Sequence, residues 1–336
     1  MKKLTIMTIV CFYFLTAFGQ NGLTGGDYFL LLKDKKTISL NTYKDDEINE
    51  IRTFTIPENS MFTTDQKERV AIIDIHRNIV TLYEIQTSKE VELSIPHNLL
   101  NPKTLLLNDH NLFIGGESKG WGSIERVSEM LVQYHIQNEK WYQLEIPVEV
   151  LGFGKAVDDL VINDSLLIAI DNILMPKYIL FYRLNITEKL AFSHFEILRY
   201  YSISTNIIQG KITSKYLGIR SISYNGSNNI SISKGFDYKK SFSISSWQRE
   251  RSYHTFNDFL IIGNKVVIAS KENGLGFLKI RKSYFNRHKR IKASKISYKK
   301  YKGENIINLT LIPNTTRIVL TIEDNRAKIR HEIIKL

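Results

Sequence analysis

The chain repeats one short pattern, and its clearest copy runs from Asp158 to Ile197. This copy contains four apolar runs of strand length: DDLVIND, SLLIAID, KYILFYRL and KLAFSHFEI. An Asn-Asp turn, a Met-Pro turn and a polar link separate the runs. Short apolar runs bounded by turn residues predict four antiparallel strands that follow one another along the chain.

Six further segments align with this copy, at 28–57, 70–96, 104–147, 207–245, 258–298 and 307–336. Three of them end in Ile-Pro, at Pro57, Pro96 and Pro147. Proline is tolerated at the end of an edge strand because no ladder bond is lost there. The first segment lacks an initial strand and the last lacks a fourth, which gives about 26 strands in all.

A four-strand unit that recurs about every 40–50 residues resembles the blade of a β-propeller. The resemblance covers the chain from Tyr28 to its end, but WD, kelch and aspartate-box signatures are absent, so it names no specific family. It implies an all-β propeller of four-stranded antiparallel blades. Seven blades with an incomplete seam fit the strand count better than six. A parallel β-helix is the alternative fold.

Composition favours one large domain. The chain has 336 residues, of which 43% are hydrophobic and 11% aromatic, so it can bury a substantial core. No low-complexity tract divides it. We therefore expect a single propeller domain over residues 20–336.

The first 19 residues read as an export signal. Lys2 and Lys3 precede an apolar stretch from Leu4 to Phe18, and Ala17-Phe18-Gly19 supplies the small residues of a cleavage site before Gln20. The stretch is about 15 residues, shorter than the roughly 20 of a membrane span. The pattern resembles exported proteins of the Bacteroidetes, and it predicts a periplasmic or secreted protein. The one cysteine, Cys11, lies inside this signal, so the mature chain would have no thiol.

Motifs for catalysis or metal binding are missing from the sequence. No HExxH, GxSxG, P-loop or EF-hand pattern occurs, and the eight histidines show no zinc-ligand spacing. We expect no metal, no cofactor and no catalytic residue. Asp158 and Asp159 precede the first strand of the clearest unit, but adjacent strand residues point to opposite sides. His135 falls within a strand and is predicted to face solvent.

An insertion at 115–129 interrupts the third unit and carries Trp121 between glycines. A tryptophan on such a loop can stack on a sugar or anchor a protein partner. The alternative is a loop that folds back and buries its own tryptophan.

Charge is divided unevenly along the chain. Residues 20–198 carry 17 Lys and Arg against 26 Asp and Glu, whereas residues 199–303 carry 22 against 4. The segment 279–302 contains eleven basic residues and no acidic one. We predict that it follows the outer strands of the sixth blade and binds a partner. The predicted contacts are Lys279, Arg281, Lys282, Arg287, Lys289, Arg290, Lys292, Lys295 and Tyr298, together with Trp121.

The leading functional hypothesis is a non-enzymatic, monomeric binding or scaffold module. Its partner would be an acidic protein, an anionic polysaccharide or a lipid headgroup, since a basic surface attracts polyanions. Export makes a nucleic-acid partner less plausible. Lysines on an outer strand can also act only to prevent sheet-to-sheet aggregation. The alternative function is a hydrolase or lyase that acts on an extracytoplasmic polymer at the propeller face.

Overall fold

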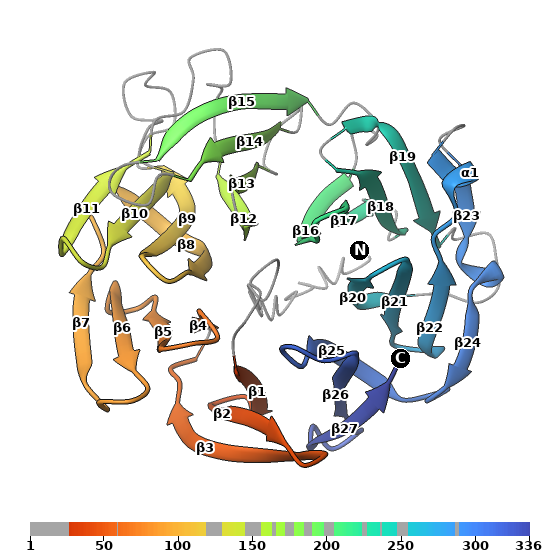
Figure 1. Ribbon diagram of the computed structural model, residues 1–336, viewed down its shortest axis with the longest axis horizontal. Coiled ribbons are helices and arrows are strands. Elements are labelled where there is room, and N and C mark those ends of the chain that lie inside the picture. The colour runs from red at the N-terminus through yellow and green to blue at the C-terminus, as the bar shows by residue number, and fades with distance from the viewer. Residues whose placement is uncertain are drawn as a thin grey trace, which may run out of the picture.

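The computed structural model describes residues 27–58, 60–118, 130–144, 156–162, 166–171, 178–184, 190–197, 205–223, 227–235, 237–246, 255–285 and 289–336. Within these residues, 27 strands form seven separate sheets. The sheets follow one another around a ring (Figure 1), and all but one of the pairings between their described strands are antiparallel. The prediction of a seven-bladed β-propeller is therefore confirmed.

Blades one to four are simple meanders with strands in chain order. Blade one contains β1 (Tyr28–Asp34), β2 (Thr37–Lys44) and β3 (Glu47–Thr55). Blade two contains β4 (Met61–Thr64), β5 (Arg69–Asp74), β6 (Ile79–Glu84) and β7 (Glu90–Ser94). Blade three contains β8 (Leu99–Leu107), β9 (Asn111–Ser118), β10 (Leu131–His135) and β11 (Lys140–Gln143). Blade four, the clearest copy in the sequence, contains β12 (Val157–Ile162), β13 (Leu166–Asp171), β14 (Tyr178–Arg183) and β15 (Ala191–Ile197).

Blades five and six exchange a strand. Blade five contains β16 (Thr205–Ile212), β17 (Tyr216–Ser223), β18 (Asn228–Lys234), β19 (Asp237–Ser245) and a fifth strand, β23 (Arg290–Lys292). Blade six contains β20 (Phe256–Ile262), β21 (Lys265–Ser270), β22 (Gly274–Lys279) and β24 (Ser297–Lys300). The chain leaves blade six after β22, forms the short helix α1 (Lys282–Phe285), and runs parallel to β19 as β23. It then returns through a 3₁₀ turn, Ala293–Lys295.

This path corrects the sequence prediction that segment 279–302 follows the outer strands of the sixth blade alone. The segment is divided between the outer edges of two blades. No other strand pairing among the named strands of the described residues is parallel. No helix within the described ranges is long and apolar enough to cross a membrane.

Among the described residues, blade seven contains β25 (Asn305–Leu311), β26 (Arg317–Glu323) and β27 (Ile329–Lys335), so the predicted incomplete seam lies between it and blade one. Side-chain contacts cross this seam, and no described strand is shared across it. Arg317 Nη2 lies 2.7 Å from the Asp46 carboxylate, and a His331 ring nitrogen lies 2.9 Å from the Leu32 carbonyl oxygen. Phe29 of blade one belongs to the same buried apolar cluster as Val319 of blade seven.

The core is a series of apolar layers between neighbouring blades. Between blades four and five, Ile168 and Ile170 pack against Leu217 and Ile219, and all four side chains are fully buried. Burial of one such side chain stabilises the fold by about 1.5–3 kcal/mol. Gly210 completes this layer, because a Cβ there would lie 2.8 Å from the Ile170 Cδ1 atom.

Candidate functional site

The basic segment, residues 279–302, crosses the outer edges of blades five and six (Figure 1). Within it the apolar side chains of Tyr284, Phe285, Ile291 and Ile296 are buried. The described basic side chains around them are exposed, namely Lys279, Arg281, Lys282, Lys289, Arg290, Lys292, Lys295 and Lys302. The apolar residues therefore hold the segment against the ring, and the described cations point to solvent.

Aromatic rings anchor the segment to blade five. Phe285 stacks on Tyr216 with ring centroids 5.8 Å apart and ring planes 4° apart. Tyr284 and Phe285 both meet the edge of Phe242, at 5.3 Å and 5.2 Å. Aromatic pairs of this geometry contribute about 0.5–1.5 kcal/mol beyond their buried area. The Lys289 ammonium lies 5.0 Å from the Tyr284 ring centroid, so a cation–π contact holds this lysine.

Several cations of the basic segment lack acidic neighbours. Among the described residues, no ion pair involves Lys279, Arg281 or Arg290. Lys279 lies opposite Lys265 in the β21–β22 ladder, which places two exposed ammonium groups side by side. Like charges at directly opposed strand positions repel each other. This part of the surface thus carries positive charge that its described neighbours do not neutralise.

Two of the predicted contacts, Arg287 and Trp121, lie outside the described residues. Tyr298 lies in β24, partly buried, with its ring packed over Gly276. A Cβ at Gly276 would lie 2.7 Å from the Tyr298 ring, so glycine is required for this contact. Burial raises the pKa of the Tyr298 hydroxyl. The ring supports the basic segment from below, while the lysines and arginines form its outer surface.

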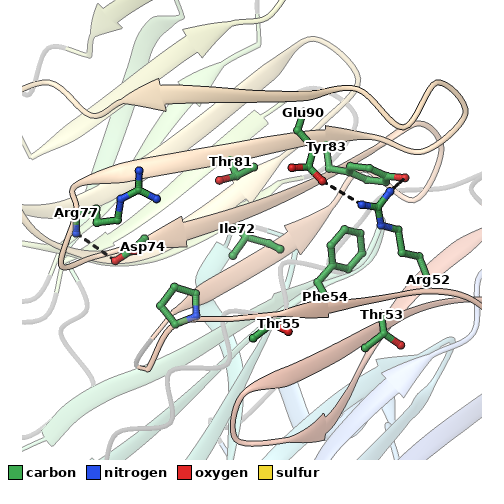
Figure 2. A pocket seen from close by; sticks show the side chains of 11 residues that line it. Arg52, Thr53, Phe54, Thr55, Ile72, Asp74, Arg77, Thr81, Tyr83 and Glu90 are labelled. Atoms are coloured by element: carbon green, nitrogen blue, oxygen red, sulfur yellow. Dashed lines mark hydrogen bonds and ion pairs between the residues drawn. The ribbon is translucent and has the colours of Figure 1, made fainter.

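A groove of about 330 Å³ lies between the outer strand of blade one and the face of blade two (Figure 2). At one end the Arg52 guanidinium stacks on Tyr83, 4.2 Å from the ring centroid, and forms an ion pair with Glu90 at 3.0 Å. Phe54 meets the Tyr83 ring edge to face at 5.1 Å. Arg52 is thus fixed by an aromatic face and a carboxylate together.

The other end of the groove carries Asp74 and Arg77. Asp74 accepts hydrogen bonds from the backbone N–H groups of His76 and Arg77, so it caps the β5–β6 turn. Figure 2 shows the contact with Arg77. The Arg77 guanidinium lies 3.3 Å from Glu92. Both arginines of the groove therefore have acidic partners, in contrast to the basic segment.

The adjacent carboxylates Asp158 and Asp159 face different blades. Asp158 forms an ion pair with Lys103 of blade three at 3.1 Å. Asp159 accepts a hydrogen bond from the Gly210 N–H of blade five. The expectation that they point to opposite sides agrees with this geometry. His135 was expected to face solvent, but it is 1% exposed and its Nδ1 accepts a hydrogen bond from the Asn138 N–H.

Sequence reasoning missed three buried charges on the inner strands of blades five and six: Lys211, Arg220 and Asp258. Lys211 and Asp258 are each 2% exposed. One signal was present, because Asp159 and Asp258 occupy the same place in their units, directly before an apolar run. A charged residue repeated at a strand position that lies next to the core indicates a partner inside the fold.

No protein-family model matches the chain, and no curated protein matches its sequence. Solved structures are similar in fold. Hydrazine synthase of Kuenenia stuttgartiensis superposes with a TM-score of 0.60 at 10% identity, over 93% of this chain and 96% of that chain. The dihydro-heme d1 dehydrogenase NirN superposes with a TM-score of 0.53 at 11% identity, over 94% of this chain and 74% of that chain. The computationally designed protein Ika8 superposes with a TM-score of 0.51 at 10% identity, over 95% of this chain and 89% of that chain. At this level of identity the likeness shows the fold alone, and the chain is a β-propeller that resembles both enzymes and proteins of other kinds.

Proposed function

We propose that this protein is an exported, non-enzymatic binding module that captures an acidic protein or anionic polymer on its basic segment. The observation that carries the proposal is the arrangement of residues 279–302. Buried rings and aliphatic side chains fix the backbone of the segment, and eight described basic side chains point outward from it. A rigid, positively charged surface of this kind loses little conformational entropy when a partner binds.

Long-range attraction supports the same proposal. The region 199–303 has a net charge of +18, so its field extends from blades five and six beyond contact distance. Such fields raise the rate of association with an oppositely charged partner and weaken as salt is added. Binding through the basic segment is therefore expected to be salt-sensitive, mainly through the association rate.

Protection of a sheet edge accounts for only part of the charge. Arg290 and Lys292 lie on β23, the outermost strand of blade five, where they hinder pairing with another sheet. Lys282 lies in α1 and Arg281 directly before it, at positions with no strand edge to protect. These residues favour a role in recognition.

The alternative is an enzyme on the propeller face that uses Asp158 and Asp159. Catalysis by a carboxylate pair requires both groups to reach one substrate. Asp158 turns toward Lys103 in blade three, and Asp159 turns toward Gly210 in blade five. This geometry gives the enzyme hypothesis no support from the pair, so we favour the binding module.

Charge reversal tests the proposal. The variant with Lys289, Arg290, Lys292 and Lys295 all changed to Glu is expected to lose capture of the partner from the native cell envelope. A matched control changes four exposed cations elsewhere, Lys36, Lys89, Arg326 and Lys328, to Glu. Both variants change net charge equally, and only the first should lose capture. Equal capture by the two variants would contradict the proposal. Mass spectrometry of the mature protein tests export, with Gln20 expected at its N-terminus.

A further inference from the structure

The two inner strands of blade five, β16 and β17, lie toward the ring axis (Figure 1). They carry two cationic side chains and one amide on the side of the blade that faces blade six. Gln209 in β16 lies directly opposite Arg220 in β17. Lys211 follows Gln209 by two positions, and side chains two apart on a strand share a face. Gln209, Lys211 and Arg220 therefore point to the same side of the blade. The Lys211 side chain is only 3% exposed there.

Each cation has at least one N–H donor that finds no acceptor among the described residues. The Lys211 ammonium lies 3.9 Å from Asp258 Oδ1, beyond hydrogen-bond distance, and donates no hydrogen bond within the described residues. Arg220 donates through Nη1 to the Phe256 carbonyl oxygen, but its Nε is buried and has no partner among the described residues. Burial lowers the pKa of the Arg220 guanidinium to about 10.

The nearby carboxylates do not supply the missing acceptors. Asp258 accepts hydrogen bonds from the backbone N–H groups of Phe259 and Leu309, one on each oxygen. Asp159 likewise accepts a hydrogen bond on each oxygen, one from the Leu160 N–H and the other from the Gly210 N–H. The Lys211 ammonium and the Arg220 Nε therefore have no acceptor among the described residues.

An unsatisfied acceptor completes the group. The Gln209 Oε1 atom is buried and accepts no hydrogen bond within the described residues. Each buried polar group left without a partner costs about 1–3 kcal/mol, and folded proteins contain few of them. Here two sets of donors and one acceptor lie together on one face, so a single small ligand could satisfy all three.

We propose that Gln209, Lys211 and Arg220 form a binding site for a small oxyanion that also carries a hydroxyl group, with hydrogen phosphate as the simplest example. The oxygens of the anion accept from the Lys211 ammonium and the Arg220 guanidinium, which are strong charge-assisted donors. The hydroxyl donates to Gln209 Oε1. Sulfate has the same shape as phosphate but carries no proton at neutral pH, so it leaves the Gln209 oxygen unsatisfied. This site is separate from the basic segment and does not depend on its proposed function.

Calorimetric titration of the purified full-length chain with inorganic phosphate at neutral pH tests the site. Phosphate is expected to bind and to raise the melting temperature, and sulfate is expected to bind more weakly. The Lys211→Met variant keeps the length of the side chain and removes the charge. It should bind phosphate roughly ten- to hundredfold more weakly, the loss expected for one charge-assisted hydrogen bond.

A second variant keeps the test decisive if Lys211→Met fails to fold. Gln209→Leu retains both cations and removes only the acceptor, so it should reduce phosphate affinity to the level of sulfate. The absence of any phosphate binding by the unmodified protein would overturn the proposal. Unchanged phosphate affinity in a folded Lys211→Met variant would also overturn it, and equal affinity for phosphate and sulfate would overturn the role of Gln209.

Discussion

Asp258 on the innermost strand of blade six accepts a hydrogen bond through Oδ2 from the backbone N–H of Leu309 in blade seven, at 2.8 Å. Asp159 in blade four forms the same link to Gly210 in blade five. In both cases the partner lies 51 residues further along the chain, and the aspartate follows a shift of strand register. The same hydrogen bond from a backbone N–H to an aspartate thus links blade four to blade five and blade six to blade seven.

Removal of this connection at Asp258 should destabilise the fold strongly. Asp258→Ala leaves the Leu309 N–H without an acceptor and the buried Lys211 without its counter-charge. Loss of one member of a buried charge pair typically costs about 3–5 kcal/mol. Asp258→Asn keeps an oxygen that can accept from the Leu309 N–H, so this variant should lose less stability than Asp258→Ala. Urea unfolding of both variants measures the difference, and equal losses would show that the hydrogen bond to blade seven is not the stabilising contact.

Asp159 should make stability fall as pH rises through the weakly acidic range. Burial raises the pKa of Asp159 from 3.8 to about 7, against the opposing effects of the Gly210 N–H and Lys211. Between these values the folded protein retains a proton that the unfolded chain releases, so folding becomes less favourable as pH increases. Above about pH 7 the folded protein has also released this proton, so stability falls no further through Asp159. The free energy of unfolding of Asp159→Asn, measured from pH 4 to 8, should lack this decline, and parallel curves would contradict the assignment.

His331 at the seam should have the opposite dependence. Burial lowers the pKa of His331 below its ordinary 6.5, and the nearby Lys33 acts in the same direction. Below pH 6.5 the unfolded chain takes up a proton that the folded chain resists, so stability falls as pH falls. His331→Gln retains a donor for the Leu32 carbonyl oxygen and cannot titrate. Its thermal stability between pH 7 and 5 should decline less than that of the unmodified protein, whereas an equal decline would locate the titrating group elsewhere.

The strand pattern and the number of blades could be predicted because alternation of apolar residues is a local property of the sequence. The four-residue strand β4 was missed, since its Thr63 and Thr64 are buried without an apolar alternation to mark them. The path of β23 into blade five rests on contacts with Phe242 and Tyr216, which lie far away in the sequence. The buried charges were missed for the same reason, because their partners belong to other blades.

Proteolysis should show whether the apolar anchor of the basic segment is separable from the propeller. Ile291 in β23 is 6% exposed and lies beside Ile244 of β19. Ile291→Ser removes an apolar contact and buries a hydroxyl, which should detach the segment while the seven sheets remain folded. Trypsin cleaves after Lys and Arg, so the detached segment should be cut early. The control variant Lys295→Ala changes an exposed position and should be cleaved at the rate of the unmodified protein. Cleavage of both variants at that same rate would mean that Ile291 does not anchor the segment.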